Sequence, residues 1–165
     1  TPAPPPAEAL GDTLFRKGLE HYAKEAWGEA IASYQAALEA DPTSSRAAYN
    51  LGLAFKANGD LDRAAKAFVV ALELQKDMPK ALYMLGLTEI QRGRNPSALA
   101  HLNRLIRVQP DFDKAHYLLG RIWREEGRPD MVRIHFERFL HLTPTGSSAD
   151  SVRRWLEQNQ GGAQE

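Results

Sequence analysis

Residues 49–72 read YNLGLAFKANGDLDRAAKAFVVAL, and this stretch decides the fold. Its apolar residues recur at helical spacing on both sides of Asn58-Gly59-Asp60, which indicates two helices joined by a turn. Gly59 suits the end of the first helix because glycine tolerates a positive φ. Asp60 suits the start of the second helix because its carboxylate can accept from free backbone N–H groups. The stretch therefore predicts a helical hairpin.

This pattern recurs with a period of 34 residues along most of the chain. The recurring columns are Gly18, Gly52, Gly86 and Gly120; Ala30, Ala64, Ala98 and Val132; Tyr34, Phe68, Leu102 and Phe136; and Ala37, Ala71, Leu105 and Phe139. Such a period is typical of stacked structural units, and the apolar spacing from residue 7 onward lacks the alternation of strands. The sequence therefore predicts an all-α solenoid of helix-turn-helix repeats.

The period also predicts where the segments begin and end. The four repeats are expected at residues 11–44, 45–78, 79–112 and 113–146. Residues 1–10 begin Thr-Pro-Ala-Pro-Pro-Pro and predict a Pro-rich linker, which is a tether or a boundary through a disordered tail. Ser147 and Ser148 can cap a last helix over 147–159, which we expect to cover the apolar flank of the fourth repeat. Residues 160–165 are expected to form a flexible tail.

Composition excludes several classes of function. The 165 residues include 21 basic and 21 acidic side chains, so no net charge draws the chain to nucleic acid or to an anionic membrane. No apolar run approaches the roughly 20 residues of a transmembrane helix, and we expect no membrane insertion. The absence of cysteine excludes disulfides, thiolate nucleophiles and Cys-based metal sites. It favours a periplasmic location slightly, while a cytoplasmic one is nearly as compatible.

The residues that carry chemistry show no catalytic pattern. His101 and His135 share one position of the repeat, but no His-x3-His pair is present to suggest zinc. Neither a phosphate-binding glycine loop nor a Gly-x-Ser-x-Gly motif occurs. We therefore expect a protein that is not an enzyme, with no cofactor, no metal and no small-molecule substrate.

The 34-residue unit resembles the tetratricopeptide repeat. The match is carried in the second repeat by Asn50-Leu51-Gly52, Gly59-Asp60-Leu61, Ala64, Phe68, Ala71 and Leu72, and it covers residues 11–146. The first repeat departs from the pattern at Lys17, His21 and Glu25. This resemblance implies a right-handed superhelix whose first helices line a concave groove, and a function in binding peptides or helices of other proteins.

The resemblance implies that positions 2, 5, 6, 9, 12 and 13 of each first helix face this groove. These columns combine leucines and aromatic residues with a basic edge, so we expect an apolar or amphipathic segment of a partner protein to bind there. Tyrosine is common at position 5 of this repeat, so a framework role is favoured over a binding role for these tyrosines. The expected groove residues are Phe15, Leu19, Tyr22, Arg46, Tyr49, Asn50, Leu53, Lys80, Tyr83, Met84, Leu87, Ile90, Lys114, Tyr117, Leu118 and Arg121.

Three other kinds of partner are conceivable. Asn50 and Lys80 match the family's two-carboxylate clamp for chaperone C-termini, but Phe15, Leu19 and Met84 occupy its other positions, which disfavours that ligand. Self-association into a structural assembly is the main alternative. RNA binding is a minor one. It depends on arginines in and next to the fourth repeat, which are Arg121, Arg124, Arg128, Arg133, Arg138, Arg153 and Arg154. Their charge is expected to be neutralised by Glu125, Glu126, Glu137 and Glu157.

Overall fold

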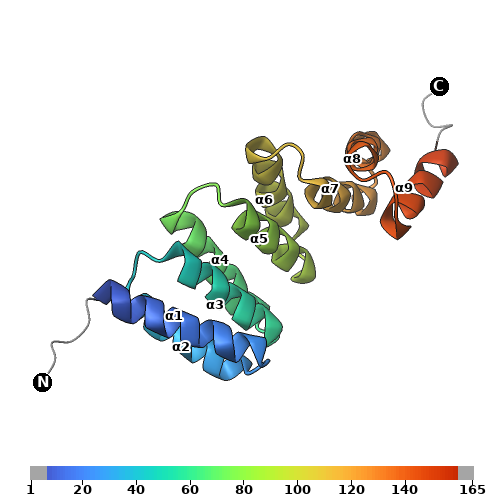
Figure 1. Cartoon of the computed structure of the whole chain (residues 1–165). Coiled ribbons are helices and arrows are strands. Elements are labelled where there is room, and N and C mark those ends of the chain that lie inside the picture. Colours follow the sequence, from blue (N-terminus) through green and yellow to red (C-terminus); the bar gives the residue numbers. More distant parts are fainter. Residues whose placement is uncertain (1–6, 160–165) are drawn as a thin grey trace, which may run out of the picture. The chain divides into compact units, whose positions relative to one another are not determined.

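The computed structural model describes residues 7–159, which form helices and turns and contain no strand (Figure 1). The helices are α1 (Ala7–Ala23), α2 (Trp27–Ala40), α3 (Ser45–Ala57), α4 (Leu61–Leu74), α5 (Pro79–Gln91), α6 (Asn95–Val108), α7 (Asp113–Glu125), α8 (Pro129–Leu142) and α9 (Ser147–Gln158). The all-α prediction is confirmed for this part of the chain. Residues 1–6 of the predicted linker and the predicted tail 160–165 lie outside the described residues. Residues 7–10 belong to α1 and not to a linker.

The chain divides into two compact units, the first ending at Arg94 and the second beginning at Asn95. Unit 1 holds α1 to α5 and unit 2 holds α6 to α9, and within each unit every helix packs against the next (Figure 1). The boundary falls inside the third predicted repeat, 79–112. Among the described helices, none has the length and apolar character required to cross a bilayer.

The turns between paired helices follow the predicted chemistry. Gly59, Gly93 and Gly127 adopt φ values of 82°, 71° and 67°, in the left-handed region that favours glycine. Asp60 caps α4, because its Oδ1 accepts from the backbone N–H of Arg63 at 3.0 Å. The predicted helical hairpin of residues 49–72 is therefore confirmed at its turn.

Glu25 shows that the first repeat keeps this turn without the glycine. Its φ is 58°, so a side chain with a Cβ occupies the left-handed conformation that Gly59 occupies in the second repeat. This conformation costs about 1–2 kcal/mol for most L-residues. We expect Glu25→Gly to raise the free energy of unfolding by about 0.5–1 kcal/mol, after the larger chain entropy of glycine is subtracted. Urea unfolding followed by circular dichroism measures this difference, and Gly59→Ala should change stability in the opposite direction.

The repeated glycines allow close packing of paired helices against aromatic rings. A Cβ added to Gly18 would lie 2.5 Å from the Tyr34 ring, and one added to Gly52 would lie 2.6 Å from the Phe68 ring. In unit 2 a Cβ on Gly120 would lie 2.3 Å from the ring of Phe136. These rings are almost fully buried, so they have little room to move aside. The glycine column and the aromatic column of the sequence therefore record the same contact, in which a ring fills the space that a Cβ would occupy.

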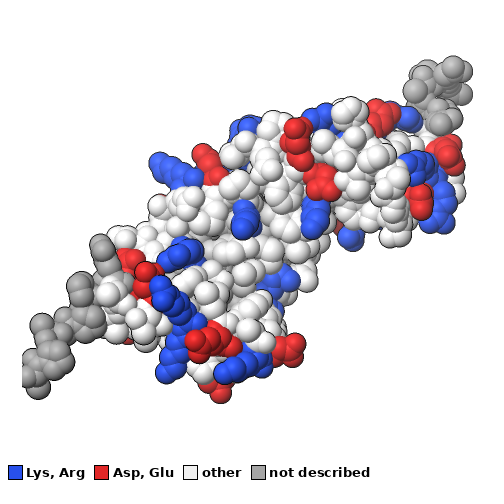
Figure 2. Space-filling model, in the orientation of Figure 1, with Lys and Arg blue, Asp and Glu red and all other residues white. Residues whose placement is uncertain are grey.

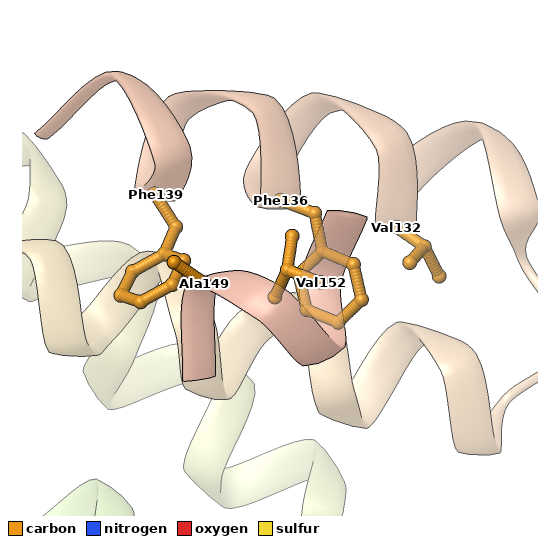
Figure 3. Close-up of a cluster of buried hydrophobic side chains, with 5 residues drawn as sticks. All are labelled: Val132, Phe136, Phe139, Ala149 and Val152. Carbon is orange, nitrogen blue, oxygen red and sulfur yellow. The ribbon is translucent and has the colours of Figure 1, made fainter. Parts of the chain in front are cut away.

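The last helix, α9, covers the apolar side of α8 in unit 2. Figure 3 shows Val132, Phe136 and Phe139 of α8 directed toward Ala149 and Val152 of α9, and these five residues form a buried cluster. Trp155 and Leu156 pack at its edge. The predicted cap by Ser147 and Ser148 is wrong, because Gly146 is the N-cap residue and no side chain accepts from the first turn. The serines instead lie inside the helix, where the Ser147 carbonyl accepts from the hydroxyl of Ser151.

Candidate functional site

Burial defines which side of the first helices in unit 1 is free. In α3 and α5 the same six repeat positions are buried, and they are Ala47, Ala48, Leu51, Gly52, Ala54 and Phe55 in α3 and Ala81, Leu82, Leu85, Gly86, Thr88 and Glu89 in α5. The positions expected to face a partner are the complementary set, and all of them are exposed or half-buried in these two helices. We call this side of α1, α3 and α5 the first-helix face of unit 1.

Three leucines occupy equal positions on the first-helix face. Leu19 of α1 is 42% exposed, and Leu53 of α3 and Leu87 of α5 are half-buried. A large aliphatic side chain that remains in water is unfavourable by the transfer free energy of its uncovered area. In Figure 2 the surface of unit 1 over α3 and α5 is mostly uncharged, with isolated blue side chains. The leucines therefore lie on a surface that can bury apolar groups of a partner.

Arg46 joins α1 to α3 on this face. Its Nη2 donates to Oδ1 of Asp12 at 2.9 Å, and its guanidinium lies over the Phe15 ring, 4.7 Å from the centroid. Both side chains of the ion pair are more than half exposed, so the pair adds little to stability. Phe15 itself is only 8% exposed and packs on Tyr34. The expectation that Phe15 offers an exposed surface is wrong, because Tyr34 and Arg46 cover its ring.

The tyrosines of unit 1 are anchored in the helix packing. Tyr22 contacts Trp27 edge to face, with ring centroids 4.9 Å apart, and Tyr49 packs on Phe68 at 5.8 Å. Burial raises the pKa of Tyr49, and its proximity to Tyr22 raises the pKa further. Tyr83 is half-buried in the same column. These rings have the framework contacts of an ordinary core while part of each remains accessible.

The other expected residues of unit 1 fall into polar and apolar groups. The Asn50 amide donates to the Arg46 carbonyl at 2.9 Å, one turn back on its own helix, and its oxygen accepts from no described residue. Met84 and Ile90 are half-buried on α5, and Lys80 is exposed near the start of that helix. Asn50 is therefore held in place with one acceptor free for a ligand.

Unit 2 holds the remaining four expected residues. Lys114 and Tyr117 line a cavity of about 290 Å³ between the start of α7, the end of α8 and the start of α9. Arg121 lies beside Tyr117, with its guanidinium 5.9 Å from the ring centroid. Leu118 is only 6% exposed, so the expectation of an exposed residue is wrong there as well. It lies on the packed side of α7 with Leu119 and Ile122.

Four of the seven arginines in and next to the fourth repeat form ion pairs within unit 2. Arg128 pairs with Asp130 at 3.0 Å, Arg133 with Glu137 at 3.7 Å, and Arg153 with Asp150 at 3.0 Å. Arg138 pairs with Asp111. Aspartates therefore supply most of the neutralising charge, where the sequence had suggested four glutamates. The pairs leave fewer free cations for RNA than the sequence count implied.

Two arrangements were missed by the sequence analysis. Glu89 of α5 is buried and pairs with Arg92, which also pairs with Asp62 of α4. The equivalent residues in the other repeats are His21, Phe55 and Trp123. The sequence signal for this buried pair was a single acidic residue at a repeat position that otherwise carries aromatic or histidine side chains. In unit 2, Nδ1 of His116 and Nδ1 of His135 lie 3.2 Å apart, although the residues are 19 positions apart in sequence and on different helices. No pattern of spacing indicates such a pair.

The histidine pair has a defined proton arrangement. Nε2 of His116 lies 2.9 Å from the carbonyl oxygen of Pro110. Because a carbonyl only accepts, Nε2 of His116 carries the hydrogen, and its Nδ1 accepts from Nδ1–H of His135. Burial and, to a smaller extent, proximity to His116 together lower the pKa of His135 to about 4. Within residues 7–159 no group of three or more potential metal ligands occurs.

Comparison with known proteins identifies the repeat. Two family models, both described as tetratricopeptide repeat, match residues 15–81 and 55–122, which together span well over half of the chain. No curated protein matches the chain.

Solved structures share the fold. The crystal structure of MamA is 26% identical, with a TM-score of 0.78 over 80% of this chain and 77% of that one. A tetratricopeptide repeat protein from Parabacteroides merdae is 20% identical, with a TM-score of 0.85 over 93% of this chain and 61% of that one. YrrB, described as a TPR protein with an unusual peptide-binding site, is 20% identical with a TM-score of 0.74 over 89% of this chain and 78% of that one. At these identities the likenesses to the P. merdae protein and to YrrB show the fold alone.

Proposed function

The chain belongs to the tetratricopeptide repeat family, whose fold supports protein–protein interaction, and from this premise we propose that it is a non-catalytic adaptor that binds an apolar or amphipathic segment of another protein on its first helices. The observation that carries the proposal is the row of Leu19, Leu53 and Leu87 on the free side of α1, α3 and α5. Apolar residues gathered on an accessible surface are typical of binding sites. The peptide-binding site named for YrrB is in keeping with this use of the fold.

The half-buried tyrosines support the same proposal. Tyr49 and Tyr83 lie one turn before Leu53 and Leu87, on the same side of their helices. A tyrosine that is anchored at its base and accessible at its edge presents apolar area at a small entropic cost. The leucines and tyrosines together form a surface that a helix or an extended peptide can cover without rearrangement of unit 1.

A peptide selection tests the leucine row directly. Peptides of about 16 residues displayed on phage are selected against the whole chain, and their affinities are measured by fluorescence anisotropy. We expect the combined Leu19→Asp and Leu53→Asp variant to bind the selected peptides at least about tenfold more weakly, because an aspartate cannot cover the apolar area of the ligand.

The matched control lies on α4 of the same unit. Val69 and Val70 are exposed to nearly the same degree as Leu19, so Val69→Asp with Val70→Asp makes the same chemical change outside the first-helix face. This control should keep wild-type affinity. Equal loss in both variants, or full retention in the leucine variant, would show that the leucine row is not the binding surface. Thermal unfolding followed by circular dichroism checks that each variant is folded.

Self-association is the second candidate, and the exposed valines are the observation that favours it. Val69, Val70 and Leu74 leave an apolar strip on the second helix of the second repeat. Light scattering over a range of concentrations measures the oligomeric state. A dimer that Val69→Asp with Val70→Asp dissociates would assign assembly to α4, whereas a dimer that the leucine variant dissociates would assign it to the first-helix face.

A further inference from the structure

The first-helix face of unit 1 is positively charged, although the whole chain is neutral. Its positions 2, 5, 6, 9, 12 and 13 carry four basic side chains and one acidic side chain in α1, α3 and α5. The basic ones are Arg16, Arg46, Lys56 and Lys80, and the acidic one is Asp12. Because the chain as a whole has 21 residues of each sign, this ratio is a local property of the face.

Most of this positive charge is not neutralised within the unit. Asp12 is already paired with Arg46. In the part of the chain that the structure describes, no carboxylate lies within ion-pair distance of Arg16, Lys56 or Lys80, and all three side chains are exposed or half-buried. Free cations at the edge of an apolar surface select partners by the sign of their charge.

The cations border the leucine row on both sides. Arg16 lies one helical turn before Leu19, and Lys80 lies two turns before Leu87, on the N-terminal side of the row. Lys56 lies one turn after Leu53, on the C-terminal side. An amphipathic helix has an apolar stripe with a polar border along each edge. The arrangement therefore matches a helix whose apolar stripe meets the leucines and whose two borders meet the cations.

We infer that the partner segment is an acidic amphipathic helix, with aspartate or glutamate on both borders of its apolar stripe. This inference rests on the proposed function, which requires only an apolar or amphipathic segment. A nucleic acid also carries negative charge, but its phosphates would leave the apolar area of Leu19 uncovered. The leucine row and the free cations together favour a protein helix.

The test uses two designed peptides and the whole chain. The peptides have about 18 residues, share one leucine stripe, and carry glutamate or lysine at all border positions. We expect the glutamate peptide to bind at least about tenfold more tightly at about 50 mM salt, since several exposed ion pairs replace several repulsions. The difference should shrink as salt rises to about 500 mM, because solvent-exposed charges are screened. Fluorescence anisotropy measures both affinities.

Charge reversal locates the effect. The Arg16→Glu with Lys80→Glu variant should lose the preference for the glutamate peptide by about tenfold. The matched control is Lys66→Glu with Lys76→Glu, which makes the same change of net charge at exposed positions outside the first-helix face. This control should keep most of the preference. Equal losses in both variants would show that net charge and not the face selects the peptide, and would overturn the inference.

The remaining outcomes separate the inference from the proposed function. If both peptides bind equally and both are lost in the Leu19→Asp with Leu53→Asp variant, the proposed function stands and the acidic partner is wrong. If the folded chain binds neither peptide, both are wrong. A single-stranded RNA oligonucleotide that binds wild type, is lost in Arg16→Glu with Lys80→Glu and is retained in the leucine variant would assign the cations to nucleic acid and overturn the inference.

Discussion

Gly52→Leu is expected to lower the free energy of unfolding of unit 1 by about 3 kcal/mol or more. A Cβ alone at this position would lie 2.6 to 3.0 Å from three atoms of the Phe68 ring. The ring is fully buried between α3 and neighbouring helices, so it cannot swing into solvent. The added side chain must force α3 and α4 apart, which opens the apolar packing that both helices share. Chemical unfolding followed by circular dichroism measures the loss.

A control and a double-mutant cycle make this prediction specific. Gly28 lies on α2 with nothing within 4 Å of an added Cβ, so Gly28→Leu should leave stability unchanged or raise it by up to about 1 kcal/mol through helix propensity. Combining Gly52→Leu with Phe68→Ala removes the ring that the leucine meets. The double variant should lose less stability than the sum of the two single losses, by at least about 1 kcal/mol. Additive losses would contradict direct contact between residue 52 and the ring.

Unit 2 is expected to lose stability as the pH falls from about 6.5 toward 4. The ordinary pKa of histidine is 6.5, and the folded pKa of His135 is about 4. Between these values the unfolded chain binds a proton that the folded chain excludes, so the free energy of unfolding decreases as the pH falls. The contribution of neutral His135 to the free energy of unfolding is fully present above pH 6.5. Its loss over the whole range down to pH 4 amounts to about 3 kcal/mol. Thermal unfolding at several pH values measures the slope.

The structural reasons are the burial of the His135 ring and the single hydrogen between its Nδ1 and the facing Nδ1 of His116. His116 already donates from Nε2 to Pro110, and a second proton would place N–H groups on both Nδ1 atoms, 3.2 Å apart. In His135→Gln the amide can still donate to His116 but does not titrate, so the slope between pH 6.5 and 4 should become smaller. His141, which is exposed on the same helix, provides the control. A slope that His141→Gln abolishes and His135→Gln preserves would contradict this assignment.

The fold was predictable because its determinants are local and repeated. Gly59 marks a turn by its conformational freedom and Asp60 by its capping carboxylate, and the glycine recurs at the equivalent positions 93 and 127. Glu25 departs from the repeat pattern in sequence, yet its backbone adopts the same left-handed conformation, because the packing of α1 on α2 imposes the turn. The Ser147 cap failed because Gly146, with φ of 104°, occupies the N-cap position, so that the helix begins at Ser147 itself.

The candidate site was predictable only in part. Repeat position placed Leu19, Leu53 and Leu87 on the accessible side of their helices, because that position lies opposite the buried set in each first helix. Exposure itself was not predictable for Phe15, whose ring is covered by Tyr34 and by Arg46 from the next repeat. The same holds for Leu118, which lies on the packed side of α7. Such coverage depends on side chains of neighbouring helices, and the residues found at one repeat position do not specify these neighbours.

The sequence by itself determined the secondary structure, the turns and the pairing of consecutive helices, since each follows from residues within one repeat length. The tertiary structure decided which ionisable groups of different helices meet, namely Arg46 with Asp12, Arg92 with Asp62, and His116 with His135. It also divided the chain between α5 and α6, inside a repeat that looks regular in sequence. These features depend on distances between side chains of different helices. Helical periodicity specifies which face a residue occupies, and only the packed helices specify what lies opposite it.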